Sequence, residues 1–206
     1  KTGWCFAPTC FVFCMLLAYV PLHVCAQNRD VDSITSLLNN YKRSKNFIED
    51  TGYINTLNTL GFKLFASKPD TAVLLGLETI ALCEKINYKK GKAEALKNRG
   101  LVYNLKGAYD SALSTYAAGL KIATDNGYTD VAGRLYHNSA ITYTNLGKYP
   151  EALENYFKAL KMREQIGEKL GISSSTNGIG TVYFLENKYD EALVYFTKAM
   201  QISEEI

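Results

Sequence analysis

Histidine and cysteine, on which most metal and nucleophile chemistry depends, are scarce in this sequence. It has two histidines and five cysteines among 206 residues, and only His137 and Cys83 lie beyond residue 26. A metal site needs three or four ligands, and a nucleophilic triad needs a base beside its nucleophile. We therefore expect no catalytic residue, metal site, cofactor or enzyme in residues 27–206, although further sequence could carry a catalytic domain. The apolar helical setting of Cys83 predicts a buried structural thiol.

A block of lysine and arginine is also missing. The 23 basic and 20 acidic residues leave a formal net charge of +3 and are spread along the chain. Nucleic-acid-binding regions gather their cations in one stretch or on one face, so no DNA or RNA partner is predicted. With 47% hydrophobic and 21% charged residues, the composition is that of an ordinary globular protein.

No apolar run near the N-terminus reaches the roughly 20 residues that span a bilayer. The run over residues 11–20 is followed by Pro21, and the chain becomes polar after Ala26. This pattern is typical of a secretory signal, so residues 1–26 are predicted to be a signal peptide and the protein to be exported, into the periplasm or another extracytoplasmic space. A membrane anchor is the main alternative. A lipoprotein is disfavoured because Cys25 follows valine instead of a small residue.

What the sequence has in abundance is internal repetition. The stretch Asn98–Leu113 reads NRGLVYNLKGAYDSAL, and related text returns forty residues later at Asn138–Leu153 and forty beyond that at Gly178–Leu193. The shared positions are Tyr103, Tyr143 and Tyr183, then Tyr109, Tyr149 and Tyr189, then Ala112, Ala152 and Ala192. A leucine follows each of the three alanines. A repeat of this length predicts a supersecondary unit that buries its apolar face against its neighbours.

Each unit is predicted to hold two helices. In the second unit the apolar spacing indicates a helix over Ala93–Leu105, a left-handed turn at Gly107 and a second helix that Asp110 starts. This helix is expected to reach about Thr124, before the turn signal that ends in Gly127. Because connections this short force neighbouring helices to run antiparallel, the units should stack as helical hairpins.

The beginning of the array is less regular. Leu57–Gly61 is similar to Leu96–Gly100, which indicates a degenerate first unit from about Asp50. This alignment makes the following connection one residue tighter than in later units, with Pro69 opening the second helix. Before the array, residues 27–50 carry a short amphipathic pattern that predicts one leading helix.

The repeated positions resemble the tetratricopeptide repeat pattern over residues 51–206. The resemblance implies an all-α, right-handed α-α superhelix, a solenoid of four helix-turn-helix repeats at about 51–90, 91–130, 131–170 and 171–206. The period of forty instead of the commoner 34 resembles the variant with longer helices and longer inter-repeat turns found in kinesin light chains and many bacterial sensor proteins. The usual tryptophan of the first helix is absent, since Leu96, Tyr136 and Thr176 stand in its place.

The resemblance also implies a peptide-binding groove lined by the first helix of each unit. The residues expected there are Lys97, Asn98, Arg134, His137, Asn138 and Asn177. In the forty-residue families an asparagine ladder resembles a device for holding a peptide backbone, because an amide both donates and accepts. Asn98 and Asn138 match that pattern, whereas position 178 is glycine; the alternative is that these asparagines bond neighbouring helices. Arg134 would favour an acidic partner.

The expected function is therefore binding of a protein or peptide. The exported forty-residue arrays that this chain resembles form the extracytoplasmic input region of bacterial signal-transduction proteins, where a transmembrane helix and a histidine kinase or DNA-binding regulator follow. The resemblance thus implies a two-component or similar sensor, with membrane contact only through further sequence. A freestanding periplasmic or secreted scaffold without an output domain is the alternative.

Overall fold

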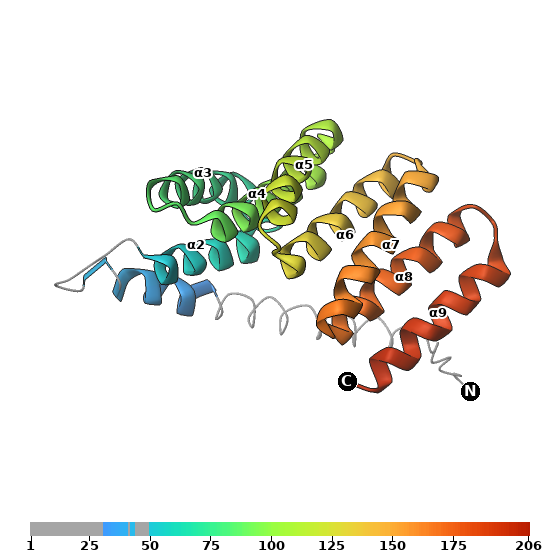
Figure 1. Ribbon diagram of the computed structural model, residues 1–206. Helices are drawn as coiled ribbons and strands as arrows, with labels where there is room; N and C mark the ends of the chain where they lie inside the picture. Colours follow the sequence, from blue (N-terminus) through green and yellow to red (C-terminus); the bar gives the residue numbers. More distant parts are fainter. Residues whose placement is uncertain (1–30, 41, 44–49) are drawn as a thin grey trace, which may run out of the picture. The chain divides into compact units, whose positions relative to one another are not determined.

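A computed structural model describes residues 31–40, 42–43 and 50–206, in which the regular elements are all helices (Figure 1). The chain divides into two compact units, Lys1–Phe47 and Ile48–Ile206. Within the first unit, residues 31–40 and 42–43 are helical, in the stretch where one leading helix is predicted. The predicted signal peptide, residues 1–26, lies outside the described residues and stays a prediction.

The second unit is a solenoid of antiparallel helical hairpins (Figure 1). Its helices are α2 (Thr51–Leu64), α3 (Pro69–Lys85), α4 (Lys89–Leu105), α5 (Tyr109–Asp125), α6 (Thr129–Asn145), α7 (Tyr149–Ile166), α8 (Lys169–Leu185) and α9 (Tyr189–Glu204). Each helix packs against the next, and α2, α4, α6 and α8 also pack against one another in succession. Among the described residues the second helices of the hairpins make no such contacts. The first helices therefore line the inner side of the curved stack, and the all-α repeat superhelix is confirmed.

Left-handed residues set the repeat length. Positive φ angles of 68° to 73° occur at Gly107, Gly127, Gly147 and Gly167, and Asn87 and Asn187 take the same place with φ of 55° and 61°. The turn after α4 shows the mechanism, because Ala108 N–H donates to the Tyr103 carbonyl at 2.9 Å and thus closes the helix end. Turns within and between units both span three residues here, at 106–108 and 126–128. The family resemblance implied longer turns between units, and this prediction is wrong. The period of forty comes from the length of the helices.

Helix starts differ in detail from the sequence expectation. The helix predicted to start at Asp110 begins at Tyr109, with Ala108 as an N-cap that makes no side-chain bond. Asp110 lies in the first turn instead, where its carboxylate faces the positive end of the helix dipole. A capping side chain does begin the array, because Asp50 accepts a hydrogen bond from Tyr53 N–H at 2.9 Å.

In the first unit, equivalent residues lie forty positions before those of the second unit. The alignment of Leu57 with Leu96 had implied a spacing of 39. The connection between α2 and α3 spans residues 65–68, one residue longer than the turn at 106–108, so the predicted tightening is wrong. Asn58 is buried like Asn98, whereas Thr59 is exposed. Asn58 therefore occupies the position of Asn98, one repeat earlier.

The repeat-defining residues build the core. Ala112, Tyr116 and Leu135 are completely buried where α4, α5 and α6 meet. Gly100 faces the Tyr116 ring so closely that a Cβ atom on it would collide with the ring. Small residues at these positions thus let paired helices approach each other, and the aromatic rings fill the remaining space. No helix in the described part of the chain is both long and apolar enough to cross a bilayer.

Candidate peptide-binding groove

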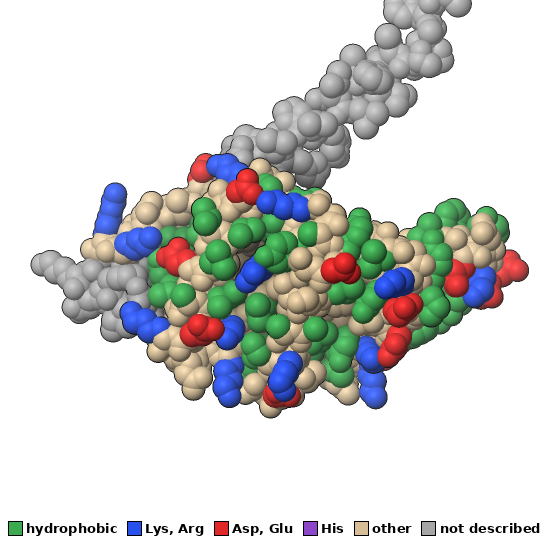
Figure 2. Space-filling model, turned by 90° about the horizontal axis from the view of Figure 1, so that it is seen from above, with side chains coloured by type: hydrophobic (Ala, Val, Ile, Leu, Met, Phe, Trp, Pro, Cys, Tyr) green, Lys and Arg blue, Asp and Glu red, His purple; other side chains and the backbone are tan. Residues whose placement is uncertain are grey.

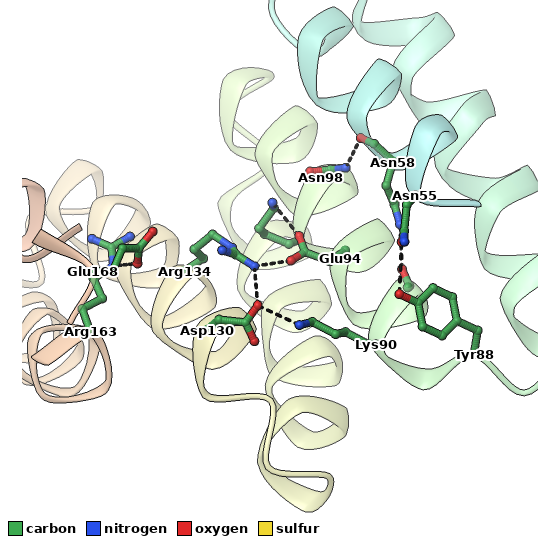
Figure 3. Close-up of polar contacts among 12 residues, drawn as sticks. Asn55, Asn58, Tyr88, Lys90, Glu94, Asn98, Asp130, Arg134, Arg163 and Glu168 are labelled. Carbon is green, nitrogen blue, oxygen red and sulfur yellow. Dashed lines mark hydrogen bonds and ion pairs between the residues drawn. The ribbon is translucent and has the colours of Figure 1, made fainter. Parts of the chain in front are cut away.

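A hollow of about 370 Å³ opens on the inner side of the array between α2 and α4. Its wall is made of amides, two aromatic rings, a hydroxyl and charged side chains, from Asn55, Asn58, Thr59, Phe62, Tyr88, Lys90, Glu94, Lys97 and Asn98. Figure 3 shows the asparagines on one side and the charged residues on the other. We use the name inner groove for this hollow together with Asp130, Arg134 and Asn138 on the neighbouring first helix, α6.

Asn98 is the most deeply placed amide of the inner groove. Its side chain is 5% exposed, and its Nδ2 donates to the main-chain carbonyl of Asn58 at 2.8 Å. Asn58 in turn donates from Nδ2 to the Gly91 carbonyl at 3.0 Å, so both amides join α2 to α4. The Oδ1 atom of Asn98 is buried and has no partner within the described chain. The Nδ2 donor of Asn98 therefore bonds a neighbouring helix, whereas its Oδ1 acceptor has no partner within the described chain.

A chain of ion pairs crosses the inner groove from α4 to α6. The Glu94 carboxylate accepts from Lys97 Nζ at 2.7 Å and also from Arg134. Asp130 accepts from Arg134 at 3.2 Å and pairs with Lys90 at 3.0 Å. Three cations thus share two carboxylates, as Figure 3 shows for the labelled members. Arg134 is thus paired with both carboxylates, and the cluster as a whole carries one excess positive charge.

The pKa values of the two carboxylates reflect this pairing. Burial by itself would raise the pKa of Glu94, but Lys97 and Arg134 outweigh it and hold the pKa below its ordinary value. The pKa of Asp130 is likewise lowered, because hydrogen bonding and attraction from Lys90 and Arg134 exceed the cost of burial. Both groups are therefore ionised at neutral pH, and the network is fully charged. On the face shown in Figure 2, acidic and basic side chains are likewise interspersed.

His137 lies at the contact between α6 and α8. Its Nδ1 is 3.3 Å from Ser175 Oγ and 3.4 Å from the Arg163 guanidinium. Arg163 is 6% exposed and donates to the Gly171 carbonyl at 2.7 Å and to Ser175 Oγ at 2.9 Å. Burial, together with the charge of Arg163, lowers the pKa of His137 to about 4. His137 is therefore neutral at neutral pH and belongs to a polar contact between units.

The two remaining predicted residues lie apart from this contact. Asn138 on α6 is half-buried, and its side chain makes no hydrogen bond to any described residue. Asn177 on α8 is exposed and lines a different hollow, between α8 and α9. The structure thus brings Lys97, Asn98 and Arg134 together around Glu94, and it leaves His137, Asn138 and Asn177 outside that cluster.

Several residues of the site were not predicted from the sequence, and Asn58, Glu94 and Arg163 are the most informative of them. Asn58 escaped because the first unit was aligned one residue out of register. Glu94 and Arg134 stand forty residues apart at the same repeat position, a charge complementarity that the sequence does contain. Arg163 gave no such signal, because its equivalents Cys83 and Ala123 are uncharged. In the described part of the chain, no group of three or more His, Cys, Asp or Glu residues is placed to hold a metal ion.

Comparisons with known proteins agree with this architecture. The family model described as "Tetratricopeptide repeat" matches residues 131–205. No curated protein sequence matches the chain. Among solved structures, BtubC from P. vanneervenii superposes with a TM-score of 0.71 at 19% identity, covering 88% of this chain and 75% of that one. A putative kinesin light chain from Podospora anserina gives 0.61 at 14% identity, with 92% of both chains covered.

A third similar structure is a Rap protein complexed with Competence and Sporulation Factor. It superposes with a TM-score of 0.73 at 14% identity and covers 84% of this chain. The chain spans only half the length of that protein, 50%. At such identities these likenesses show a shared fold alone.

Proposed function

This chain is a tetratricopeptide repeat protein, and we propose that its inner groove binds an extended peptide segment of a partner protein. One observation carries the proposal, the buried and unpartnered Oδ1 of Asn98 at the wall of the groove. A buried acceptor without a donor costs about 1–3 kcal/mol, and a ligand N–H removes that cost. A peptide main-chain N–H serves whatever side chain the ligand carries.

Two further features of the groove support a peptide. Asn138 offers a second amide one repeat further along the same side, and its side chain is unbonded within the described chain. Phe62 is 44% exposed, its ring centroid lies 5.2 Å from the Lys97 ammonium, and its ring offers an apolar contact beside the amides. The one excess positive charge of the ion-pair chain favours an acidic side chain in the ligand. The Rap protein with its bound factor is an example of a related fold that holds a partner.

The test is selection of peptide ligands from a displayed random library, followed by calorimetric titration of the best ligand. Asn138→Ala should weaken binding by about tenfold, because it removes hydrogen bonds to the ligand, and should leave the thermal midpoint unchanged. Asn155→Ala is the matched control, since Asn155 lies on α7 and bonds only within its own helix at 2.8 Å. Unchanged affinity in Asn138→Ala and in Asn98→Ala would contradict the proposal.

We further propose that the array acts outside the cytoplasm as the sensory input region of a longer signal-transduction protein. The apolar run followed by Ala26 supports export, and the near-balanced charge of +3 is compatible with a protein partner. A fusion of residues 1–50 to a reporter that is active only after export should be active. A complete gene that ends shortly after Ile206, without a membrane-spanning segment, would instead favour the freestanding scaffold.

A further inference from the structure

A second hollow, of about 400 Å³, opens where the ends of α3 and α5 meet the start of α4. In the array α4 packs against both α3 and α5 (Figure 1). We call this hollow the edge hollow and define it by Cys83, Tyr88, Lys89, Lys121, Ile122 and Asp125. Its volume lies within the range of about 300–1,000 Å³ that is usual for small-molecule sites. Of the residues that line it and the hollow of the inner groove, only Tyr88 is shared.

The floor of the edge hollow is apolar and uncharged. Cys83 is 1% exposed, and burial raises the pKa of its thiol to about 11, so the thiol is neutral at neutral pH. The ring of Tyr88 lies against Gly91, where a Cβ atom would collide with the ring and approach Cys83 Sγ at 3.0 Å. Ile122 of α5 is half-buried and lines the same hollow. The apolar body of a ligand therefore finds matching contacts on this floor.

Charged side chains border the hollow, and one cation among them is unpaired. Lys92 Nζ donates to the Glu84 carboxylate at 2.6 Å, and Lys121 Nζ donates to Asp125 at 3.0 Å. Lys89 is exposed and has no hydrogen-bond or ion-pair partner in the part of the chain that the structure describes. Three cations thus face two carboxylates, and the excess positive charge lies at Lys89.

The last hairpin shows why Lys89 stays unpaired. Eighty residues after Lys89, its equivalent Lys169 pairs with Glu205 at 3.0 Å. The residue equivalent to Glu205 is Asp125, which Lys121 holds within α5 instead. In the last hairpin the equivalent of Lys121 is an uncharged glutamine, which does not compete for Glu205. Lys121 therefore keeps Asp125 away from Lys89, and the cation at the edge hollow remains available to a ligand.

We propose that the edge hollow binds a small aromatic carboxylate. The flat body of the ligand lies against the Tyr88 ring and Ile122, because aromatic rings stack or meet edge to face. Its carboxylate pairs with Lys89 at the border of the hollow. The positive excess charge selects an anion over a cation of the same shape. This site is separate from the inner groove and does not depend on the function proposed for that groove.

An NMR titration of the isotope-labelled full chain with naphthoate tests the proposal. The main-chain amide resonances of Asn87 and Asn126, which line the edge hollow, should shift in a saturable way. A ligand of this size should have a dissociation constant on the order of 1 mM or below. The uncharged naphthamide should bind about threefold to fivefold more weakly, because it has no charge to pair with Lys89. Acetate, which lacks the apolar body, should cause no saturable shift.

Three lysine variants locate the ligand. Lys89→Gln removes the excess cation and should weaken binding by about threefold to fivefold. Lys121→Gln releases Asp125 to pair with Lys89, as in the last hairpin, and should weaken binding to a similar extent. Lys161→Gln is the matched control, because Lys161 is an exposed lysine of α7 outside the hollow, and it should leave binding unchanged. All three lysines are exposed, so circular dichroism should show an unchanged fold.

The proposal would be overturned if naphthoate caused no saturable shift at Asn87 and Asn126. Equal affinity of wild type and Lys89→Gln, or equal affinity for the carboxylate and its amide, would equally contradict it, because the cation would then play no part. Weaker binding in Asn138→Ala together with unchanged binding in Lys89→Gln would place the ligand in the inner groove instead.

Discussion

Asn98 on α4 donates its side-chain amide to the main-chain carbonyl of Asn58 on α2, 2.8 Å away and forty residues earlier in the chain. The bond ties together the first helices of two units. The sequence left two roles open for this asparagine, a bond between helices and a bond to a ligand. In the structure the Nδ2 donor of Asn98 makes the bond between helices. Its Oδ1 acceptor has no partner within the described chain and is available for a ligand.

The two groove asparagines should therefore differ in their effect on stability. Asn98→Ala loses the bond to Asn58 and should lower the free energy of unfolding by about 1 kcal/mol. Asn138→Ala breaks no hydrogen bond of the described chain and should change it by less than about 0.5 kcal/mol. Urea unfolding of both variants measures the difference. Equal losses would mean that Asn138 also bonds a neighbouring helix.

Much of the fold could be read from the sequence because its turns are local. A glycine at 107, 127, 147 and 167 marks a helix end every twenty residues, and all four adopt the left-handed conformation that the sequence predicts at Gly107. The first unit could not be placed as well, since no glycine marks the turn at residues 65–68. The similarity of Leu57–Gly61 to Leu96–Gly100 then gave an alignment that was one residue out of register. The equivalence of Asn58 and Asn98 was therefore missed.

The same turns predict an asymmetry between glycine and asparagine. Gly147 has φ of 70° and open space around a Cβ atom, so Gly147→Ala adds backbone strain without a clash. We expect it to cost about 1 kcal/mol. Asn87 already tolerates φ of 55°, and Asn87→Gly should change stability by less than about 0.5 kcal/mol. Thermal unfolding of the two variants checks this, and a neutral Gly147→Ala would show that the turn relaxes to another conformation.

The ion-pair chain predicts a defined response to acid. The folded-state pKa of Glu94 is lowered, so its contribution to stability is fully present above the ordinary value of 4.5 and is lost as the pH falls through the lowered pKa. Arg134→Gln removes one of its two cations and should cost about 1–2 kcal/mol at pH 7. The gap between variant and wild type should narrow as the pH falls below 4.5 and should close once Glu94 is protonated in the folded protein. Urea unfolding across this range measures it.

A surface pair provides the control for Arg134. Lys121 is 79% exposed and pairs with Asp125 at 3.0 Å on α5. Lys121→Gln should therefore cost less than about 0.5 kcal/mol. A loss as large as that of Arg134→Gln would mean that overall charge, and not the partly buried network, governs the effect.

The candidate site was less predictable than the fold because its bonds join different units. The position of Arg134 on the inner side follows from helix periodicity, but its pairing depends on Glu94 one repeat earlier. That relation can be found only by comparing charges at equal repeat positions. The role of Arg163 could not be found in this way, since it is set by a packing contact between α7 and α8 that no sequence spacing encodes.

Cys83 is predicted to be unreactive in the folded protein. Its side chain is 1% exposed, and burial raises the pKa of the thiol to about 11. Iodoacetamide at pH 8 should therefore modify Cys83 only at urea concentrations that unfold the array, because the thiolate is the reactive form. Peptide mass mapping distinguishes Cys83 from the four cysteines of residues 1–26. Fast modification without urea would show that α3 opens locally.

His137 should make the protein less stable in mild acid. Burial and the nearby Arg163 lower its folded-state pKa to about 4, from an ordinary value of 6.5. Between these values the unfolded chain takes up a proton that the folded chain excludes, so stability falls as the pH drops through 6.5 and levels off below 4. From pH 7 to pH 5 the free energy of unfolding should fall by about 2 kcal/mol.

His137→Gln isolates this effect, because glutamine keeps a polar group beside Ser175 and does not titrate. The variant should lose almost nothing between pH 7 and pH 5 in urea unfolding. Glu94 and Asp130 do not confound this window, since their lowered pKa values place their protonation at more acidic pH. An equal loss in wild type and His137→Gln would mean that His137 takes up its proton in the folded state. Arg163 would then have to move away from the ring, because two adjacent buried cations repel each other.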